Sequence, residues 1–293
     1  NGGKASALNY GIAACKTDFV VCVDADTQLQ ADAVSRLMRH FIADEAGRVG
    51  AVAGNVKVGN QRNMLTYWQA IEYTTSQNFD RMAYSNINAV TVVPGAIGAF
   101  RKKALEAVGG FTTDTLAEDC DLTMSINEHG YVIENENYAV AMTEAPETLR
   151  QFVKQRIRWS FGVMQTFWKH RSSLFARSKG GFGLWAMPNM LIFQYIIPTF
   201  SPLADILMLL GLFTGNAWQI FLYYLLFLLV DASVSIMAYI FEHERLWVLL
   251  WIIPQRFFYR WIMYYVLFKS YLKAIKGELQ TWGVLKRTGN VEA

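Results

Sequence analysis

The chain has 293 residues, of which 53% are hydrophobic and 17% are charged, and its mean hydropathy is +0.17. This composition is apolar for a soluble protein of that length, and most of the charged residues precede residue 181. A soluble part followed by a membrane part is therefore expected. The net charge of +3, with neither a run of like charges nor a basic stripe, excludes nucleic acid as a partner.

The soluble part alternates predicted helices and strands. Helical patterns cover 5–14, the amphipathic stretch after residue 30, 64–82, and a segment that starts at 102 and ends at Gly109-Gly110. Apolar, β-rich runs predict strands at 19–23, 49–58 and 89–95. Such alternation predicts an α/β layered domain with a largely parallel sheet.

The triplet Asp24-Ala25-Asp26 directly follows the first predicted strand, where ligands bind in sheets of this kind. Two carboxylates so close together repel each other unless a cation lies between or beside them. Magnesium prefers one or two carboxylates together with phosphate oxygens. The triplet thus indicates a site for a metal-bound diphosphate, although a solvated turn that caps the next helix has the same pattern.

A second acidic cluster, AEDCD, places Glu118, Asp119 and Asp121 at the predicted start of a helix. Carboxylates at a helix N-terminus are favoured by the helix dipole, which is one explanation of the cluster. The other explanation is a general base that is held near a sugar hydroxyl. The residues alone leave both open.

Residues 146–170 predict one helix, with a proline at its opening and the pentad QRIRW at 155–159. The guanidinium groups of Arg156 and Arg158 suit phosphate, the amide of Gln155 suits hydroxyls, and Trp159 offers a flat face for a sugar ring. The pentad therefore indicates a site for a phosphorylated sugar. Contact with lipid headgroups remains the alternative.

The membrane part contains three apolar segments. Residues 217–241 are long enough to span, and Asp231 near their middle is expected to face protein or a water-filled path. The prolines of 187–213 indicate that its first half lies along the interface. Polar residues within 246–271, namely Gln255, Arg256 and Arg260, suit a polymer channel or an in-plane helix better than a span. We expect two crossings and a re-entrant or interfacial third segment.

The cysteines and histidines predict no metal centre of their own. The three cysteines lack metal-ligand spacing, so they are expected to be structural, reduced thiols. The four histidines are scattered along the chain and receive no role.

Four motifs in order, GGKA at 2–5, DAD at 24–26, ED at 118–119 and QRIRW at 155–159, precede the membrane segments. In this the chain resembles the membrane-embedded processive family-2 glycosyltransferases, which make cellulose, chitin, hyaluronan and poly-N-acetylglucosamine. The resemblance implies a glycosyltransferase-A (Rossmann-like) domain in the cytosol, followed by a transmembrane α-helical region of a multi-pass plasma-membrane protein. It also implies Mg²⁺ or Mn²⁺ as cofactor.

The resemblance implies roles on the donor side of the site. Asp26 would be the metal ligand, whereas Lys4 and Asp24 would contact the nucleotide and its phosphates. Asp119 would be the general base, and Glu118 would contact substrate beside it. The family's TED motif is AED here, which removes a hydroxyl but keeps both acids.

The resemblance also implies roles on the acceptor side. Trp159 would stack on the terminal sugar, while Gln155, Arg156 and Arg158 would hold the donor phosphates and the acceptor. The stretch VPGAIGAFRKKAL at 93–105 matches the loop beneath the acceptor sugar, with glycines that allow close approach. An ordinary connecting loop is the alternative for this stretch.

The stretch TWGVLKRTG at 281–289 resembles the gating segment that follows the last membrane helix in related synthases. Trp282 would pack into the cleft, and Lys286 and Arg287 would reach diphosphate oxygens. A basic cytosolic tail is the alternative. If the stretch is a gate, it has to lie in the cytosol.

The resemblance divides the chain into a catalytic part at 1–145, interfacial helices at 146–183, membrane or interfacial helices at 184–276 and the tail at 277–293. The family's first strand and uridine-binding Asp have no counterpart here, so we expect the C-terminal two-thirds of such an enzyme, inactive alone.

The expected function is that of a processive, inverting β-glycosyltransferase that uses a UDP-sugar, best UDP-N-acetylglucosamine, and passes the polysaccharide into the membrane. Its expected partners are the donor, the growing polysaccharide, the bilayer and a small membrane accessory subunit. The alternatives are a non-processive transferase for a lipid-linked acceptor and a nucleotide-binding transporter or channel subunit.

Overall fold

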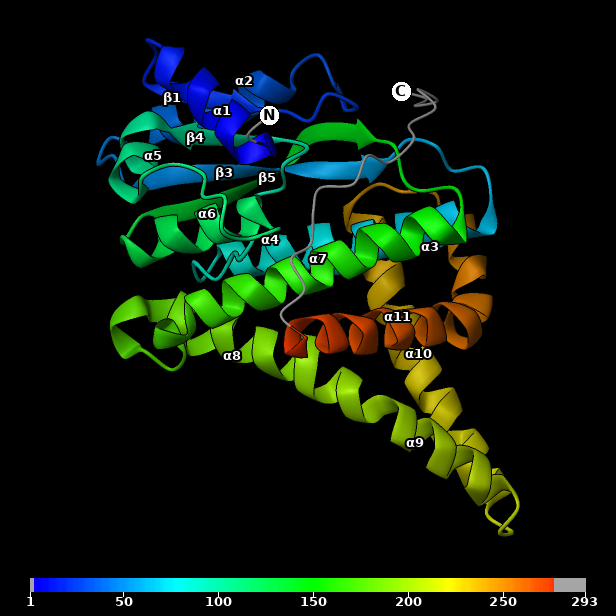
Figure 1. The fold of residues 1–293 in the computed structure, drawn as a ribbon. Coiled ribbons are helices and arrows are strands. Elements are labelled where there is room, and N and C mark those ends of the chain that lie inside the picture. Colours follow the sequence, from blue (N-terminus) through cyan, green and yellow to red (C-terminus); the bar gives the residue numbers. More distant parts are fainter. Residues whose placement is uncertain (1–2, 277–293) are drawn as a thin grey trace.

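The computed structural model describes residues 3–276, and a five-stranded sheet forms its centre (Figure 1). The strand order is β1-β4-β3-β5-β2. The strands are β1 (Phe19–Cys22), β2 (Gln28–Leu29), β3 (Val49–Val58), β4 (Gly98–Arg101) and β5 (Val132–Thr143). The sequence predicted the bounds of β3 and placed β1 to within one residue.

The sheet is mixed, so the prediction of a largely parallel sheet is wrong. Only β3 and β5 are parallel, while β4 is antiparallel to both β1 and β3, and β2 is antiparallel to β5. The predicted strand at 89–95 does not form either. Its apolar residues Ala89, Val90 and Val93 are buried, and the amide of Val93 donates to Thr123 Oγ1 at 2.8 Å. This segment packs against a helix instead of pairing in the sheet, and β4 begins after it.

The helices of this part are α1 (Gly3–Ala14), α2 (Ala33–Ala43), α3 (Met64–Glu72), α4 (Asp80–Ser85), α5 (Lys102–Val108) and α6 (Glu118–Glu128). A π-helical segment, Tyr73–Phe79, joins α3 to α4, so the predicted long helix is confirmed as one continuous element. A capping box between Asn63 and Thr66 starts it. Gly109, at φ 80°, ends α5 as predicted.

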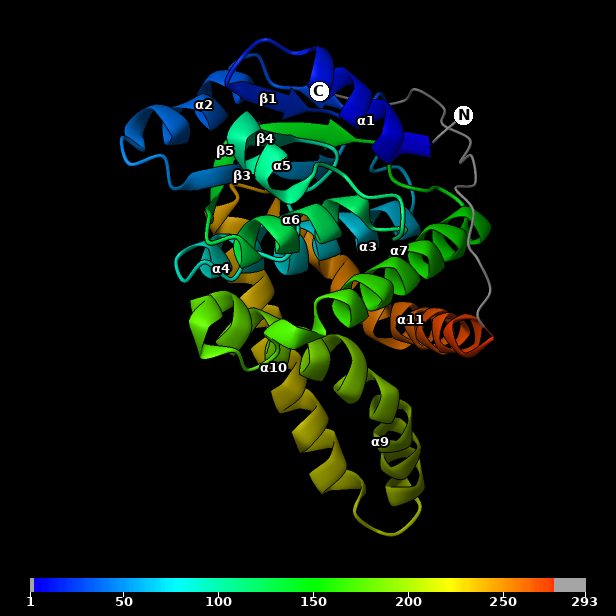
Figure 2. The same ribbon diagram turned by 60° about the vertical axis from the view of Figure 1, so that its left-hand side comes forward.

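The core of this domain lies against both faces of the sheet. Leu37 and Phe41 of α2 belong to one buried cluster, and Leu122 and Ile126 of α6 belong to another. Each such side chain contributes about 1.5–3 kcal/mol by its burial. In Figures 1 and 2, α2 lies above the sheet and α6 lies beneath it. This packing fixes α6, and with it the acidic cluster, under the sheet.

The helix that carries the pentad is α7 (Leu149–Lys169), which crosses below α6 (Figures 1 and 2). The prediction that it opens at Pro146 is wrong by three residues, because Thr148 is the N-cap and accepts a hydrogen bond from the amide of Gln151. A Cβ on Gly162 would lie 2.8 Å from the amide nitrogen of Ala117. This glycine therefore brings α7 into direct backbone contact with the chain just before α6.

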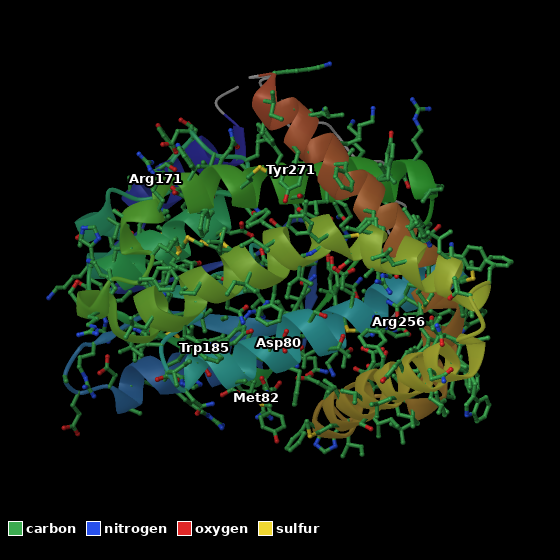
Figure 3. All side chains as sticks on the ribbon, turned by 90° about the horizontal axis from the view of Figure 1, so that it is seen from below. Asp80, Met82, Arg171, Trp185, Arg256 and Tyr271 are labelled. Carbon is green, nitrogen blue, oxygen red and sulfur yellow. The ribbon has the colours of Figure 1, made fainter. Side chains whose placement is uncertain are left out.

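The C-terminal part consists of π-helical Phe182–Ala186, α8 (Met187–Asn189), π-helical Met190–Ile196, α9 (Ile197–Leu212), α10 (Ala217–Phe241), a 3-10 segment Leu246–Trp251 and α11 (Ile252–Ile275). Helices α9 and α10 form a hairpin that projects away from the sheet (Figures 1 and 2), whereas α11 packs along α7. Seen from below, Arg171 and Trp185 lie far from Arg256 of α11 (Figure 3).

Within residues 3–276, two helices are long and apolar enough to cross a membrane, Phe182–Leu212 and Ala217–Phe241. Phe182, Met187 and Met190 at the start of the first helix are buried, whereas most of the large apolar side chains from Ile192 to Phe241 are exposed in the isolated chain. Pro188, Pro198 and Pro202 lie within the first of them without breaking it. Segment 246–275 is not among these candidates, and the number of membrane crossings stays a prediction.

The end of α10 docks onto the sheet through buried polar groups. Glu242 is 5% exposed, and its Oε2 accepts a hydrogen bond from Asn55 Nδ2 of β3. Lys57 Nζ lies 2.7 Å from Glu244 Oε1 and donates to the carbonyl of Glu242 at 3.0 Å. The projecting hairpin is thus attached to the central strand of the sheet.

Candidate active site

The first three sequence motifs meet at one point. Lys4 Nζ lies 2.6 Å from Asp24 Oδ1 and 3.3 Å from Glu118 Oε1, and the amide of Gly95 is 3.4 Å from Asp119 Oδ2. A Cβ on Gly95 would lie 2.6 Å from Lys4 Nζ, 3.5 Å from Asp24 Oδ2 and 3.7 Å from Asp119 Oδ2. The fold therefore gathers residues from widely separated motifs around Gly95.

Each of these residues occupies the end of an element. Lys4 lies in the first turn of α1, Asp24 follows β1, and Gly95 lies in the turn before β4. Glu118 and Asp119 open α6, whose N-terminal dipole favours negative charge, and the amide of Cys120 donates to Asp119 Oδ1 at 2.8 Å. Element ends leave these groups free of the backbone hydrogen bonding that fills the interior of helices and strands.

Electrostatics couples Lys4 to the acids around it. Burial alone would lower the pKa of Lys4, but the charges of Asp24, Glu118 and Asp119 outweigh it and raise the pKa, so Lys4 stays protonated. Burial, and then the charge of Asp119, raises the pKa of Glu118, which Lys4 partly offsets. A buried carboxyl of raised pKa beside a more exposed Asp119 is typical of acid–base sites.

The residues present fit a divalent ion that is held mainly by a donor diphosphate. Asp24 and Asp26 offer hard carboxylate oxygens at the end of β1, and Asp26 is half-buried. Across residues 3–276 there is no gathering of three or more His, Cys, Asp or Glu that could hold a metal. Asp26 is the candidate ligand that the family resemblance implies, and phosphate oxygens would complete the coordination.

The pentad residue Arg156 is buried and paired. Its two terminal nitrogens lie 2.8 and 2.7 Å from the carboxylate oxygens of Glu72 in α3, and Tyr259 of α11 donates to the same carboxylate. Its guanidinium carbon lies 4.6 Å from the ring centroid of Trp159. This arrangement suits a residue that positions Trp159 better than the phosphate contact predicted from the sequence.

The other pentad residues line the same region. Gln155 is buried, and within the described chain its Oε1 has no hydrogen-bond partner, which suits an acceptor for a sugar hydroxyl. Trp159 is half-buried and packs against the core cluster that includes Ala96, the neighbour of Gly95. Arg158 is half-buried. Gly162, three residues beyond the pentad in α7, lies against Ala117, the residue before Glu118, so the helix that carries the pentad passes the start of α6.

Sequence reasoning missed three residues around the site. Gly95 was noticed only as part of a loop, and Glu72 has no local pattern that marks it as the partner of Arg156. Arg81 of α4 is also buried, where it donates to the carbonyl of Gly54 at 3.2 Å. Burial lowers the pKa of Arg81 to about 10, opposed by the charges of Asp119 and Glu242. Its place beneath the sheet depends on tertiary packing that no short motif records.

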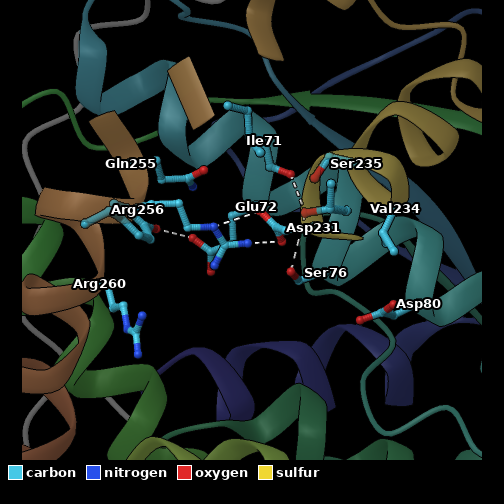
Figure 4. Close-up of a pocket in the computed structure, with 12 residues that line it drawn as sticks. Ile71, Glu72, Ser76, Asp80, Asp231, Val234, Ser235, Gln255, Arg256 and Arg260 are labelled. Carbon is cyan, nitrogen blue, oxygen red and sulfur yellow. Dashed lines mark hydrogen bonds and ion pairs between the residues drawn. The ribbon is translucent and has the colours of Figure 1, made fainter. Parts of the chain in front are cut away.

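A cavity of about 340 Å³ opens between α3, the π segment after it, α10 and α11 (Figure 4). Its walls include Glu72 and an ion pair in which Arg256 Nε lies 2.7 Å from Asp231 Oδ2. The prediction that Asp231 faces protein or a water-filled path is confirmed, because it pairs with Arg256 of α11 in the cavity wall. Arg260 also lines the cavity, and its NH2 lies 2.8 Å from Asp205 Oδ1.

Two further predictions concern the gating stretch and the cysteines. Trp282, Arg287 and the rest of the predicted gating stretch lie outside the described residues. The cysteines are free, and two of them, Cys22 and Cys120, are buried, as expected of structural thiols.

Comparison with known proteins agrees with this geometry. Residues 19–231 match the family "Glycosyl transferase family group 2". The chain is 36% identical over 162 residues to poly-beta-1,6-N-acetyl-D-glucosamine synthase of Staphylococcus aureus (strain COL), covering 55% of this chain and 39% of that protein. It is 33% identical over 172 residues to the synthase of Staphylococcus epidermidis, covering 57% and 41%. The chain thus spans about two fifths of the length of these relatives.

A solved structure is also similar. It is the mannosyltransferase PcManGT from Pyrobaculum calidifontis in complex with GDP-Man and Mn²⁺, at 21% identity and a TM-score of 0.59, and the match covers 94% of this chain and 68% of that one. This similarity confirms the glycosyltransferase-A-like fold. With the family match over most of its length, the chain belongs to the glycosyl transferase family group 2.

Proposed function

We propose that the protein is a processive, inverting β-glycosyltransferase that extends a polysaccharide from a UDP-sugar and passes it into the membrane. One observation carries this proposal: Lys4, Asp24, Glu118 and Asp119 meet around Gly95, beside the helix that carries the pentad. A charged donor site and a stacking platform for an acceptor are thereby brought together.

In the proposed reaction, Asp119 is the general base. It takes the proton of an acceptor hydroxyl while that oxygen bonds to C1 of the donor sugar, and the bond from C1 to the diphosphate breaks and leaves UDP. Asp119 is the more exposed acid of the pair, and the amides of Gly95 and Cys120 hold its carboxylate. Lys4 places a positive charge beside the diphosphate.

Asp26 would hold Mg²⁺ or Mn²⁺, which when bound neutralises charge on the diphosphate leaving group. The mannosyltransferase of similar fold was solved with Mn²⁺ and a nucleotide sugar, which supports this assignment. Asp24 acts here through Lys4, whose ammonium group it orients at 2.6 Å.

Trp159 and Gln155 would receive the acceptor end of the polymer. The Arg156–Glu72 pair connects this platform to the cavity of Figure 4, because Glu72 lies in the wall of that cavity. Helices α10 and α11 add polar side chains to its wall, among them Asp231, Gln255 and Arg260. A saccharide leaving the platform would thus enter a polar space beside the apolar hairpin, which supports transfer into a plasma membrane.

The best candidate donor is UDP-N-acetylglucosamine, because the curated relatives of this chain are named as poly-beta-1,6-N-acetyl-D-glucosamine synthases. The test is to offer the full-length protein, of which this chain is expected to be a part, several radiolabelled UDP-sugars with Mg²⁺ in lipid vesicles and to digest the product with linkage-specific hydrolases. We expect long polymer from UDP-N-acetylglucosamine that only a β-1,6-specific hydrolase degrades. Transfer of a single sugar to a lipid would instead identify a non-processive enzyme, and absence of any transfer would contradict both.

A further inference from the structure

A second charged cluster, outside the residues used above, joins α6 to the end of α7. His170 Nε2 lies 2.9 Å from Asp121 Oδ1, and His170 Nδ1 lies 2.9 Å from Glu128 Oε2. Lys169 Nζ lies 2.9 Å from Asp121 Oδ2 and 3.0 Å from Asp114 Oδ2. Asp121 is fully buried and His170 is 5% exposed, so this is a built network rather than a surface ion pair.

The geometry identifies the charge state of His170. Each ring nitrogen faces a carboxylate oxygen at hydrogen-bond distance, and a carboxylate only accepts, so both nitrogens have to donate. The ring is therefore an imidazolium, which its position at the C-terminal end of α7 also favours. Burial alone would lower the pKa of His170, but its bonds to Asp121 and Glu128 raise it to about 9.

The two carboxylates lie on one face of α6. Asp121 and Glu128 are seven residues apart, or about two helical turns, so His170 holds the helix at two points along that face. Asp119 is two residues before Asp121 and projects about 200° around the helix axis from it. The network therefore binds one side of α6, while the opposite side of the helix carries Asp119, the proposed base.

We propose that His170 is a positioning residue for sugar transfer: by clamping Asp121 and Glu128 it fixes the rotation of α6 about its axis and thereby the place of the Asp119 carboxylate. This inference rests on the proposed function, in which Asp119 is the base. The first turn of α6 needs such a clamp, because its N-cap residue Ala117 has no side chain that can cap it.

The size of the effect follows from helix geometry. A side-chain oxygen about 5–6 Å from the helix axis moves about 1 Å when the helix turns by about 10°. A misplacement of about 1 Å can lower the rate of a positioned reaction about 100-fold. Loss of the clamp should therefore lower the rate of transfer strongly, without a matching loss of donor binding, because Lys4 and Asp26 lie on other elements.

The test compares His170→Gln with His129→Gln in the full-length protein purified in detergent, because this chain alone is expected to be inactive. His129 is a matched control, since it is exposed at the other end of α6 and bonds only to the carbonyl of Ser125. We expect His170→Gln to lower kcat with UDP-N-acetylglucosamine 10- to 100-fold while its KM stays within about twofold. His129→Gln should leave both constants unchanged.

A pH profile separates a positioning charge from simple packing. The groups that face His170 are Asp121 and Glu128 of α6, with Lys169 next to it in the chain and Lys179 bonded to the carbonyl of Glu128. Wild-type kcat should fall as pH rises through about 9, where the ring loses its second proton. His170→Arg, which keeps a cation with several donors, should retain more activity than His170→Gln and should lack this fall.

Several outcomes would overturn the inference. One is a normal kcat for His170→Gln, and another is a loss of UDP binding that parallels the loss of transfer. If His170→Gln does not fold, Glu128→Gln, which keeps an acceptor but removes one charge, should still lower kcat severalfold at unchanged KM, and a normal kcat there would refute the clamp. Asp119→Asn separates the two proposals. If this variant keeps its activity, Asp119 is not the base and the proposed function is wrong. If it is inactive but His170→Gln has a normal kcat, only the clamp is wrong.

Discussion

Gly95 shows how much of the site depends on one missing side chain. Lys4, Asp24 and Asp119 all lie within 4 Å of the position that its Cβ would occupy, and Lys4 Nζ would be at 2.6 Å. Any side chain here has to displace the ammonium group from its acids. The sequence predicted a glycine-containing loop, but it did not show which side chains surround this glycine. Lys4 and Asp24 come from about 70–90 residues earlier in the chain, and Asp119 comes from about 24 residues later.

Gly95→Ala should therefore disturb the site without unfolding the protein. Because the displaced atom is the end of a flexible side chain, we expect an unchanged melting temperature but at least tenfold slower transfer. Gly11→Ala is the matched control, since no atom lies within 4 Å of its Cβ and alanine stabilises a helix interior by about 1 kcal/mol relative to glycine. Normal transfer by Gly95→Ala would contradict the close gathering of charges.

Asp26 and Asp119 should separate binding from chemistry. Asp26→Asn should weaken metal-dependent UDP binding, measured by calorimetry with and without Mg²⁺, because it removes the candidate metal ligand. Asp119→Asn should abolish transfer and leave UDP binding within about twofold. Asp32→Asn, at an exposed carboxylate paired with Arg36, serves as control for both. Equal loss of UDP binding in the first two variants would show that these roles are wrongly assigned.

The raised pKa of His170 also predicts how stability depends on pH. A group whose pKa is higher in the folded state than the unfolded value of about 6.5 stabilises the fold fully below that value, and the contribution is lost as pH rises through about 9. The difference in melting temperature between wild type and His170→Gln should thus be largest near pH 6 and vanish by about pH 10. A difference that grows with pH would mean that the ring is neutral when folded.

At the scale of elements, one carboxylate links three helices. Glu72 of α3 accepts from Arg156 of α7 and from Tyr259 of α11, in a buried setting where Arg156 is 4% exposed. Burial would lower the pKa of Arg156, but Glu72 outweighs this and raises it. The pentad therefore contributes to the attachment of α7, in addition to its proposed role as an acceptor platform.

Glu72→Gln should be strongly destabilising, because it leaves the guanidinium of Arg156 buried without a counter-charge. Loss of one partner of a buried pair costs about 3–5 kcal/mol. The control is Glu106→Gln, whose exposed carboxylate lies 4.0 Å from Lys102 and should contribute less than about 1 kcal/mol. Chemical denaturation in detergent measures both, and equal effects would contradict the role of Glu72 as a helix link.

The elements also show which patterns carry enough information to predict. The apolar, β-rich run of β3 and the apolar length of α10 are local properties, and the sequence predicted both sets of bounds. Residues 89–95 have the same β-rich character as a strand, but the amide of Val93 is taken by Thr123 of α6. The partner of a buried backbone group is chosen by tertiary structure, so composition alone assigned this segment wrongly.

At the scale of the whole molecule, the arrangement separates a polar catalytic part from an apolar hairpin. The motif residues of the site could be found from their order in the sequence, but the connections between motifs could not. Glu72 and Arg156 are 84 residues apart, and Asp121 and His170 are 49 residues apart. Neither pair has a local signature, because each is formed only when helices cross in the folded chain.

The orientation of the hairpin can be tested with single cysteines in a variant without the three native ones. If Phe182–Leu212 and Ala217–Phe241 both cross the membrane, the turn at Asn216 should react with a membrane-impermeant maleimide added to intact cells. A cysteine in place of Lys16, in the catalytic part, should react only after the cells are opened. Labelling of position 16 in intact cells would place the catalytic part on the wrong side for a cytosolic nucleotide sugar.

The polar contact between α10 and β3 has a consequence for how the protein is made. Asn55 of the central strand bonds to Glu242, 187 residues later in the chain and just beyond the hairpin. During synthesis, the ribosome releases the strand long before it releases its partner. If the hairpin crosses the membrane, it has to enter the lipid between the two events. We therefore expect the catalytic domain to reach its final form only after membrane insertion. If the insertion machinery fails, Asn55 in the nascent chain lacks its partner Glu242, and quality-control proteases can degrade the incompletely folded domain.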